Sequence, residues 1–312
     1  MQIIPPSYEI LDDLDQQSLA VRIEFSGRIC YKSEDKIDQN SALPFVSKMA
    51  EHGHNSVLEM GVLSLKVSSP EPDVLAELYA TQPRFLQIDT LPDGSLLVTG
   101  SVRAFREMLM FHPGCRLVRG MTGFLAERHP YFFSTIIPAG GLQPQPEMTI
   151  SKVSLPEIDR LPQPLRLKHR HIAVKFIVNR AVTHEIVRHR PCSFLQESQR
   201  YCRYSDNKFG GEVTFIKPMF FDEGSPEYGL WHQAMTETEQ LYLKLLETST
   251  PQAARTVLPN SCKTELIVYA NLQEWCHIFR LRTTKAAEPS MREVMIPLHK
   301  ELQGRFPELG LE

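Results

Sequence analysis

The sequence predicts an α+β fold in which helices pack around a small sheet. Two short runs have strand character: Val62–Val67 alternates apolar and polar residues, and His171–Val178 is rich in β-branched residues. Much of the remaining chain places apolar residues at helical spacing. With 312 residues, 42% of them hydrophobic, the chain can bury a sizeable core and fits one elaborated domain or two small ones.

The N-terminal part is expected to form two helices and a strand. Apolar residues at helical spacing favour a helix over Leu14–Ile29, and a second short helix over Ser41–Glu51 has Ser41 as its N-cap. Gly53 then turns the chain toward the strand Val62–Val67.

The C-terminal half is expected to be mainly helical after the strand His171–Val178. Asn179 caps a helix over Arg180–Arg188, and Ser225, followed by a proline, starts a helix that runs through Leu246. Three further helices are predicted over Pro251–Leu258, Thr264–Leu281 and Pro289–Gln303, the last interrupted near Pro297.

The run RHRPCSFLQESQRY, residues 188–201, concentrates strong polar groups. Each of its arginines (Arg188, Arg190 and Arg200) presents a fork of five N–H donors that cannot be deprotonated. One alternative is a basic helix end, since cations at a helix C-terminus complement its dipole. The continuation through Ser198 has no clean apolar period, which favours a segment held by polar contacts or by an anionic, phosphorylated ligand.

The charge distribution leaves two classes of partner open. The net charge of −3 gives no general indication of nucleic-acid binding. The stretch 166–203, however, is rich in Arg and Lys and contains only two acidic residues, Glu185 and Glu197. That local excess suits a nucleotide phosphate, and it would also suit a patch for RNA.

Cysteine and histidine spacing indicates no metal centre. The cysteines are scattered without a C-x-x-C pair, and no signal peptide or transmembrane run is evident, so a cytoplasmic location is expected. Cys192 is interpreted as a structural thiol, because a reactive thiol needs a base or a cationic setting. His184 and His189 are five residues apart, about 140° around a helix, so they cannot share one zinc ion.

Five separated segments together resemble the flavin-dependent thymidylate synthases. Arg188-His189-Arg190, followed after seven residues by Ser198, resembles the family signature. The family elements A-R-x-S/C-Y, G-H-x-S-x-x-E, A-R-x-x-L-P and N-x5-N/H-x4-R are resembled by Arg28–Tyr31, Gly53–Glu59, Ala254–Pro259 and the set Asn271, His277 and Arg282. The resemblance implies the family fold, with helices around a small, mostly antiparallel sheet.

The resemblance also implies a reaction, the reductive methylation of dUMP to dTMP, with methylenetetrahydrofolate as carbon donor, NADPH as reductant and FAD as redox cofactor. The cofactors carry the transfers, so the protein's task is orientation and electrostatics. By similarity the flavin contacts are His54, Ser56, Arg188, His189, Arg190, Asn271 and His277. By similarity the dUMP contacts are Glu185, Arg188, Gln196, Glu197, Ser198, Gln199, Arg200, Arg255 and Arg282. Arg282 is also the catalytic residue, because a fixed cation beside a uracil carbonyl stabilises charge developing on the ring.

Two positions depart from the family pattern. Met60 stands where the family often has His, which puts one flavin or folate contact in doubt. Glu197 brings an anion to the phosphate-binding run, and its side chain is expected to point away and leave its backbone N–H to serve. Family members are homotetramers with composite active sites, so a homotetramer is expected here.

Residues 68–165 are expected to be an insertion within a single catalytic domain spanning residues 1–312, because compact members lead almost directly from strand to RHR helix. Within it we predict a hairpin around Pro92–Gly94 and helices over Val102–Phe111 and Arg116–Arg128. Thr99–Arg103 resembles a T-G-N-x-R element of longer members.

Two other functions stay open. The first is a catalytically degenerate homologue that still binds flavin or nucleotide. The second is an RNA-binding protein, which would show no flavin and a steep salt dependence.

Overall fold

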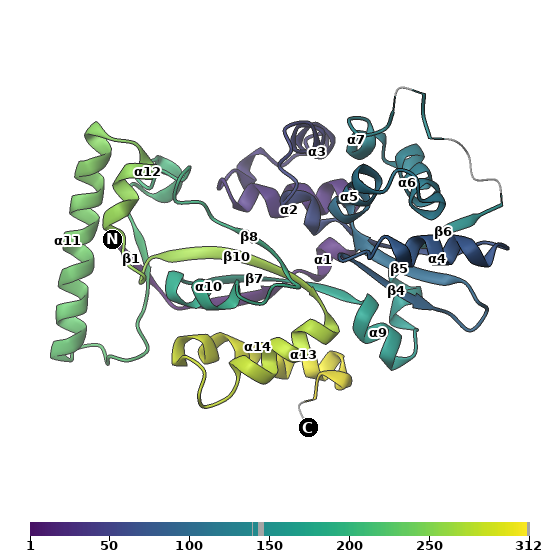
Figure 1. Ribbon diagram of the computed structural model, residues 1–312. Coiled ribbons are helices and arrows are strands. Elements are labelled where there is room, and N and C mark those ends of the chain that lie inside the picture. Colours follow the sequence, from purple (N-terminus) through teal and green to yellow (C-terminus); the bar gives the residue numbers. More distant parts are fainter. Residues whose placement is uncertain (139, 143–146, 311–312) are drawn as a thin grey trace. The chain divides into compact units, whose positions relative to one another are not determined.

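The computed structural model describes residues 1–138, 140–142 and 147–310, and the chain divides into two compact units (Figure 1). Unit 1 consists of Met1–Leu11, Arg28–Asp35 and Ile172–Glu312, and unit 2 of Asp12–Gly27 and Lys36–His171. Both combine helices with antiparallel strands, so the predicted α+β class is confirmed. The single catalytic domain with an insertion stays a prediction, and residues 139 and 143–146 of that insertion lie outside the described residues.

Unit 1 is built on a four-stranded sheet. Its strands are, in spatial order, β2 (Ser7–Ile10), β7 (His171–Asn179), β10 (Lys263–Asn271) and β8 (Ser193–Gln196). The outer pairs β2–β7 and β10–β8 are antiparallel. A separate parallel pair joins β1 (Gln2–Ile4) to β9 (Thr214–Ile216).

The helices of unit 1 begin after polar N-cap residues. They are α10 (Arg180–Ile186), α11 (Pro226–Thr248), α12 (Pro251–Ala254), α13 (Leu272–Arg282) and α14 (Pro289–Arg305), with 3-10 turns at Asn207–Phe209, Arg255–Val257 and Pro307–Leu309. The side chains of Asn179, Ser225 and Asn271 accept a backbone N–H in the first turns of α10, α11 and α13. No helix in the described part of the chain is long and apolar enough to cross a membrane.

Three expectations for unit 1 were wrong. The predicted helix Thr264–Leu281 is strand β10 as far as Asn271 and becomes helix α13 only afterwards. The reason is that a short continuous apolar run fits a fully buried strand as well as a helix. The polar run after RHR contains strand β8, which we did not expect. Helix α14 also continues through Pro297 without interruption.

Unit 2 has its own antiparallel sheet, in the order β4 (Leu86–Thr90), β5 (Leu96–Ser101), β3 (Val62–Ser68) and β6 (Thr149–Val153). Its helices are α1 (Asp12–Asp15), α2 (Leu19–Ile29, whose last two residues belong to unit 1), α3 (Ala42–Glu51), α4 (Pro72–Ala80), α5 (Val102–Phe111), α6 (Arg116–Arg128), α7 (Pro130–Phe133), α8 (Leu155–Asp159) and α9 (Gln163–His169), with a 3-10 turn, η2, at Val57–Met60. The predicted β4–β5 hairpin and helices α5 and α6 are confirmed. Ser41 precedes α3 as expected, but its hydroxyl donates to Glu24 instead of capping the helix.

A buried chain of polar groups crosses the sheet of unit 2. The hydroxyls of Ser64 and Thr99 are 2.6 Å apart, and Thr99 Oγ1 is 2.8 Å from His169 Nδ1. His169 Nε2 in turn lies 3.1 Å from an Asp89 carboxylate oxygen, which also binds the Gln87 amide. Burial lowers the pKa of His169, although the adjacent Asp89 carboxylate acts in the opposite direction.

Candidate active site

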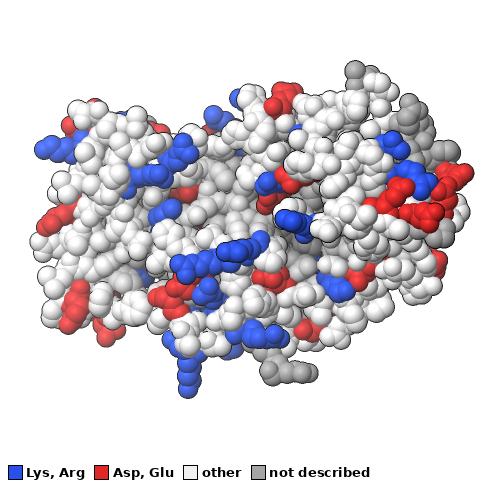
Figure 2. Space-filling model, viewed as in Figure 1, with Lys and Arg blue, Asp and Glu red and all other residues white. Residues whose placement is uncertain are grey.

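The RHR run, residues 188–190, lies between helix α10 and strand β8. The N-cap of α10, Asn179, accepts the backbone N–H of Val182 at 2.9 Å, and the helix ends just before the run. His189 is buried, whereas Arg188 and Arg190 are exposed, and their side chains make no hydrogen bond or ion pair with any residue that the structure describes. Figure 2 shows Lys and Arg side chains gathered over α10 and the neighbouring strands. Two uncommitted cations therefore flank a buried imidazole.

Arg282, at the C-terminal end of α13, joins the RHR run. Its Nε donates to His189 Nε2 at 3.1 Å. Its two terminal nitrogens donate to Glu185, one to carboxylate Oε2 at 2.7 Å and one to the backbone oxygen at 3.1 Å. Segments 93 residues apart in the sequence thus meet through one guanidinium.

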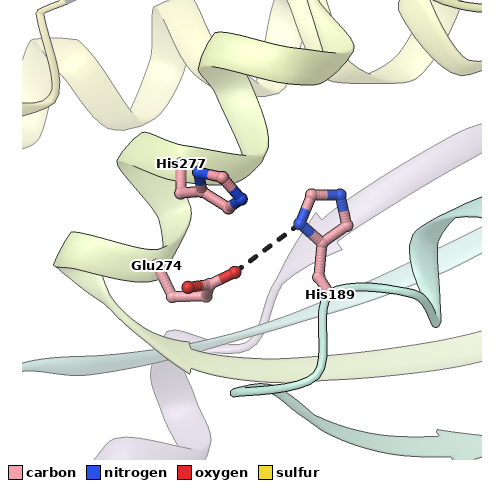
Figure 3. A group of neighbouring side chains, drawn as sticks. All are labelled: His189, Glu274 and His277. Carbon is pink, nitrogen blue, oxygen red and sulfur yellow. Dashed lines mark ion pairs between the residues drawn. The ribbon is translucent and has the colours of Figure 1, made fainter.

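His189 also faces two residues of α13, Glu274 and His277 (Figure 3). His189 Nδ1 lies 3.5 Å from Glu274 Oε1, and the rings of His189 and His277 meet edge to face at 5.6 Å. Glu274 Oε1 is buried and has no hydrogen-bond partner among the described residues. Sequence reasoning missed Glu274, although its place one turn before His277 puts it on the same side of the helix.

This trio has the chemistry of a divalent metal site. One ligand atom from each residue lies within 4.8 Å of the others, and two imidazoles with a carboxylate suit zinc. Arg282, however, can only donate, so the nitrogen it contacts on His189 must be the acceptor. The hydrogen of the neutral ring then sits on Nδ1, the atom that faces Glu274 and that a metal would need. The observed arrangement therefore favours a hydrogen bond over a metal.

Burial suppresses the reactivity of Cys192, which follows the RHR run. The thiol is buried, and desolvation raises its pKa far above the ordinary value, with the Glu274 carboxylate raising it further. A thiolate is the nucleophilic form of cysteine, so this position disfavours covalent chemistry.

The Glu197 side chain is buried in unit 1 and is hydrogen-bonded there. Its carboxylate accepts from Tyr204 Oη at 2.8 Å and from Lys263 Nζ at 2.9 Å. Burial raises the pKa of Tyr204 well above the ordinary value, and the Glu197 carboxylate raises it further, so this phenol stays a donor. The side chain points away from the surface as expected, but its backbone N–H already donates to the Glu265 carbonyl at 2.8 Å. The expectation that this N–H is free for phosphate was wrong.

The other residues of this run are less committed. Gln196 Nε2 donates to hydroxyls of Thr183 and Thr264. The Ser198 N–H donates to the Cys30 carbonyl, and its hydroxyl accepts the Arg200 N–H at 3.3 Å. Gln199 is only 7% exposed, yet its Nε2 has no hydrogen-bond partner in the described part of the chain. A buried amide nitrogen without a partner is costly, and it is the kind of group a ligand oxygen would satisfy.

Arg200 and Arg255 both adjoin helix α12. Arg200 is exposed, and its Nε donates to Gln252 Oε1 of that helix at 3.2 Å. Arg255 begins the 3-10 turn immediately after α12 and is half-buried, and its side chain has no hydrogen bond or ion pair to the residues that the structure describes. Two guanidinium groups are thus available beside this short helix.

The remaining predicted contacts, His54 and Ser56, belong to unit 2. Both are exposed in the segment between α3 and the 3-10 turn Val57–Met60, after a left-handed turn at Gly53 (φ 70°). The last residue of that motif, Glu59, binds Arg103 at 2.6 Å, so it meets the Thr99–Arg103 element through an ion pair. We did not anticipate that pairing from the sequence.

Residues 165–308 match the family model described as thymidylate synthase complementing protein. These residues are similar to that family, and they make up a little less than half of the chain. The matched region contains every predicted site residue of unit 1, from Glu185 to Arg282, and leaves out His54 and Ser56.

The curated relatives carry the name flavin-dependent thymidylate synthase. The protein of Pyrococcus furiosus is 36% identical over 128 residues, which are 41% of this chain and 52% of the relative. The protein of Corynebacterium glutamicum is 31% identical over 146 residues, covering 42% of this chain and 56% of the relative. The chain thus spans about half the length of the curated relatives it matches.

A solved structure, that of a UMP/dUMP methylase PolB from Streptomyces cacaoi bound with 5-Br UMP, is similar to part of this chain. Its TM-score is 0.38 at 20% identity, covering 45% of this chain and 71% of that one.

Proposed function

We propose that this protein is a flavin-dependent thymidylate synthase, which reductively methylates dUMP to dTMP with methylenetetrahydrofolate as carbon donor, NADPH as reductant and FAD as redox cofactor. The observation that carries the proposal is the contact of Arg282 with both His189 and Glu185. It joins the RHR run to the C-terminal motif in a region that matches the family.

The residues around the RHR run fit a flavin. Arg188 and Arg190 offer exposed cations for the diphosphate, and the exposed imidazole of His277 offers an edge to a ring system. Asn271 and His54, with Ser56, complete the set assigned by similarity. When bound, FAD supplies hydride transfer, and the task of these side chains is to bind and orient it.

The second group of residues fits a nucleotide monophosphate. Arg200 and Arg255, beside α12, would bind the phosphate, with Ser198 positioning it. The unpartnered amide of Gln199 would donate to the nucleotide. Arg282 would place an N–H against the uracil carbonyl, where it stabilises negative charge as that charge develops.

A homotetramer is supported by an exposed apolar stripe on α11. Leu230, Leu241 and Leu245 lie on one side of the helix and are 69%, 55% and 38% exposed. Tyr242 and Leu246, each about 100° around the helix from the leucine before it, are buried in the core of unit 1. Apolar stripes of this kind mark association surfaces, and a second copy of the chain would cover this one.

The deciding experiment is an FAD titration of the purified protein, followed by anaerobic addition of NADPH and an assay for dTMP. We expect saturable FAD binding, bleaching of the flavin by NADPH, and dTMP formation that requires dUMP and methylenetetrahydrofolate. Sedimentation of the same sample should give the mass of four chains.

Each other outcome points to an alternative. No saturable FAD binding with or without dUMP would refute the proposal. Flavin binding without dTMP formation would identify a degenerate homologue. Binding of RNA with a steep salt dependence and no flavin would identify the RNA-binding class.

A further inference from the structure

We propose that Glu274 is a positioning residue whose carboxylate holds His189 in the Nδ1–H tautomer, and that His189 in this form holds Arg282 in its working orientation. The catalytic consequence rests on the proposed function. The tautomer itself does not, because it follows from contacts within unit 1.

The first step concerns the hydrogen on His189. A guanidinium has donors and no acceptor, so the contact between Arg282 Nε and His189 Nε2 at 3.1 Å requires a lone pair on Nε2. The neutral imidazole then carries its hydrogen on Nδ1. The His189 side chain is only 4% exposed, so solvent offers little alternative to its protein partners.

The second step concerns the group that receives this hydrogen. Nδ1 points at Glu274 Oε1, 3.5 Å away, as Figure 3 shows. The Glu274 side chain is 14% exposed, and Oε1 has no other hydrogen-bond partner among the described residues. A buried carboxylate oxygen without a donor is unfavourable, so a shift of a few tenths of an ångström that closes this contact would stabilise both groups.

Glu274 is also fixed in place by its helix. It is the third residue of α13, and its backbone N–H donates to the Asn271 cap at 2.8 Å. A negative side chain in the first turn is favoured by the positive end of the helix dipole. The cap therefore sets the position from which the carboxylate meets His189.

The last step connects the tautomer to Arg282. Its Nε is anchored by His189 and its terminal nitrogens by Glu185, which leaves two of its five N–H donors free for a ligand. If His189 changed to the Nε2–H form, two donors would face each other and this anchor would be lost. The phosphate-side arginines, Arg200 and Arg255, make no contact with this chain of groups in the described structure, so the loss should appear in the saturated rate and not in dUMP affinity.

The test compares Glu274→Leu and Glu274→Gln with Gln273→Ala, a control at an exposed neighbour in the same helix turn. Long-range ¹H–¹⁵N NMR of the ¹⁵N-histidine-labelled protein, assigned with a His189→Gln sample, reports which ring nitrogen carries hydrogen. Steady-state dTMP formation at varied dUMP, with flavin occupancy equalised, gives kcat and KM.

We expect Nδ1–H in the wild type and Nε2–H or a mixture in Glu274→Leu. The kcat of that variant should fall about tenfold or more, as for loss of a hydrogen bond to a charged group, with KM for dUMP within about twofold. Glu274→Gln keeps a weaker acceptor and should lie between the two, and Gln273→Ala should match the wild type. If Glu274→Leu does not fold, the test uses Glu274→Gln alone, for which we expect a mixture of the two tautomers and an intermediate kcat.

Three results would overturn the inference: Nε2–H in the wild type, an unchanged tautomer in the variants, or a normal kcat in Glu274→Leu. A wild type that binds no FAD would instead remove the proposed function, while the tautomer measurement on the flavin-free protein would still decide the role of Glu274.

Discussion

Arg282 and Arg255 are both arginines of the predicted dUMP site, and the structure gives them different surroundings. Arg255 is half-buried and its guanidinium has no partner among the described residues, so it is free to bind a phosphate. A phosphate contact is equally strong in the ground and transition states, so Arg255→Ala should raise the Kd for dUMP and leave the saturated rate nearly unchanged. Losing a charge-assisted hydrogen bond costs roughly 1.5–3 kcal/mol, or about ten- to a hundred-fold in affinity.

Arg282→Ala should instead lower the saturated rate by about ten- to a hundred-fold, because its free N–H would bind the uracil oxygen more strongly as charge develops. The structural cost should stay modest. The Glu185 side chain is 33% exposed, so water can replace its ion pair, which contributes about 1 kcal/mol or less. His189 Nε2 loses its donor, which costs about 1–3 kcal/mol because the ring is buried.

Steady-state dTMP formation and a dUMP titration for both variants would measure these effects. Flavin occupancy and the melting temperature must be checked first, since Arg282 also supports His189. Lys175→Ala is a control that removes a cation bound to Glu9 on the sheet, outside the predicted site. The role assignment would be reversed if Arg282→Ala kept a normal saturated rate and Arg255→Ala lost it.

Two further predictions concern buried titratable groups. Cys192→Ala should keep nearly full dTMP formation, because burial holds the thiol pKa far above neutrality; complete loss of turnover with FAD and dUMP still bound would contradict this. Burial places the folded-state pKa of His169 below its ordinary value of 6.5. Between those two pKa values the unfolded chain binds more protons than the folded one. The free energy of unfolding should therefore be fully present above about pH 6.5 and decline as the pH falls toward the folded-state pKa. His169→Gln should reduce this decline in a series of melting curves, with His112→Gln as a control, and an unchanged pH dependence would exclude His169 as its source.

Helix caps and turn residues made much of the fold predictable. Asn179 and Ser225 mark the starts of α10 and α11, and the Asp93-Gly94 pair marks the turn of the β4–β5 hairpin. These signals are local, because a side chain caps the N–H groups two or three residues later whatever the rest of the chain does. Strand β10 was missed because its TELIVYA run is buried on all sides, which removes the alternation that identifies half-buried strands.

The site was predictable as a set of residues but not as a set of contacts. The spacing of RHR and the C-terminal motif singled out His189 and Arg282, which the structure brings together. It gave no reason to select Glu274, because a glutamate in the first turn of a helix is common and is explained by the helix dipole alone. Only the position of a second element, the RHR run, shows that this carboxylate faces an imidazole.

Glu197 and Glu274 look alike in the sequence, and their hydrogen-bond partners distinguish a structural role from a functional one. Glu197 lies inside the polar run, and its position there suggested a ligand contact, yet Tyr204 and Lys263 satisfy its carboxylate in the core. Glu274 lies outside that run, yet one of its oxygens is buried with no hydrogen-bond partner in the described residues. A fully paired buried carboxylate stabilises one arrangement of the chain, whereas an underpaired one remains able to respond to a neighbouring proton. The unpaired oxygen of Glu274, and not its proximity to a motif, therefore selects it over the fully paired Glu197 as the acidic group coupled to the arginine at the proposed uracil site.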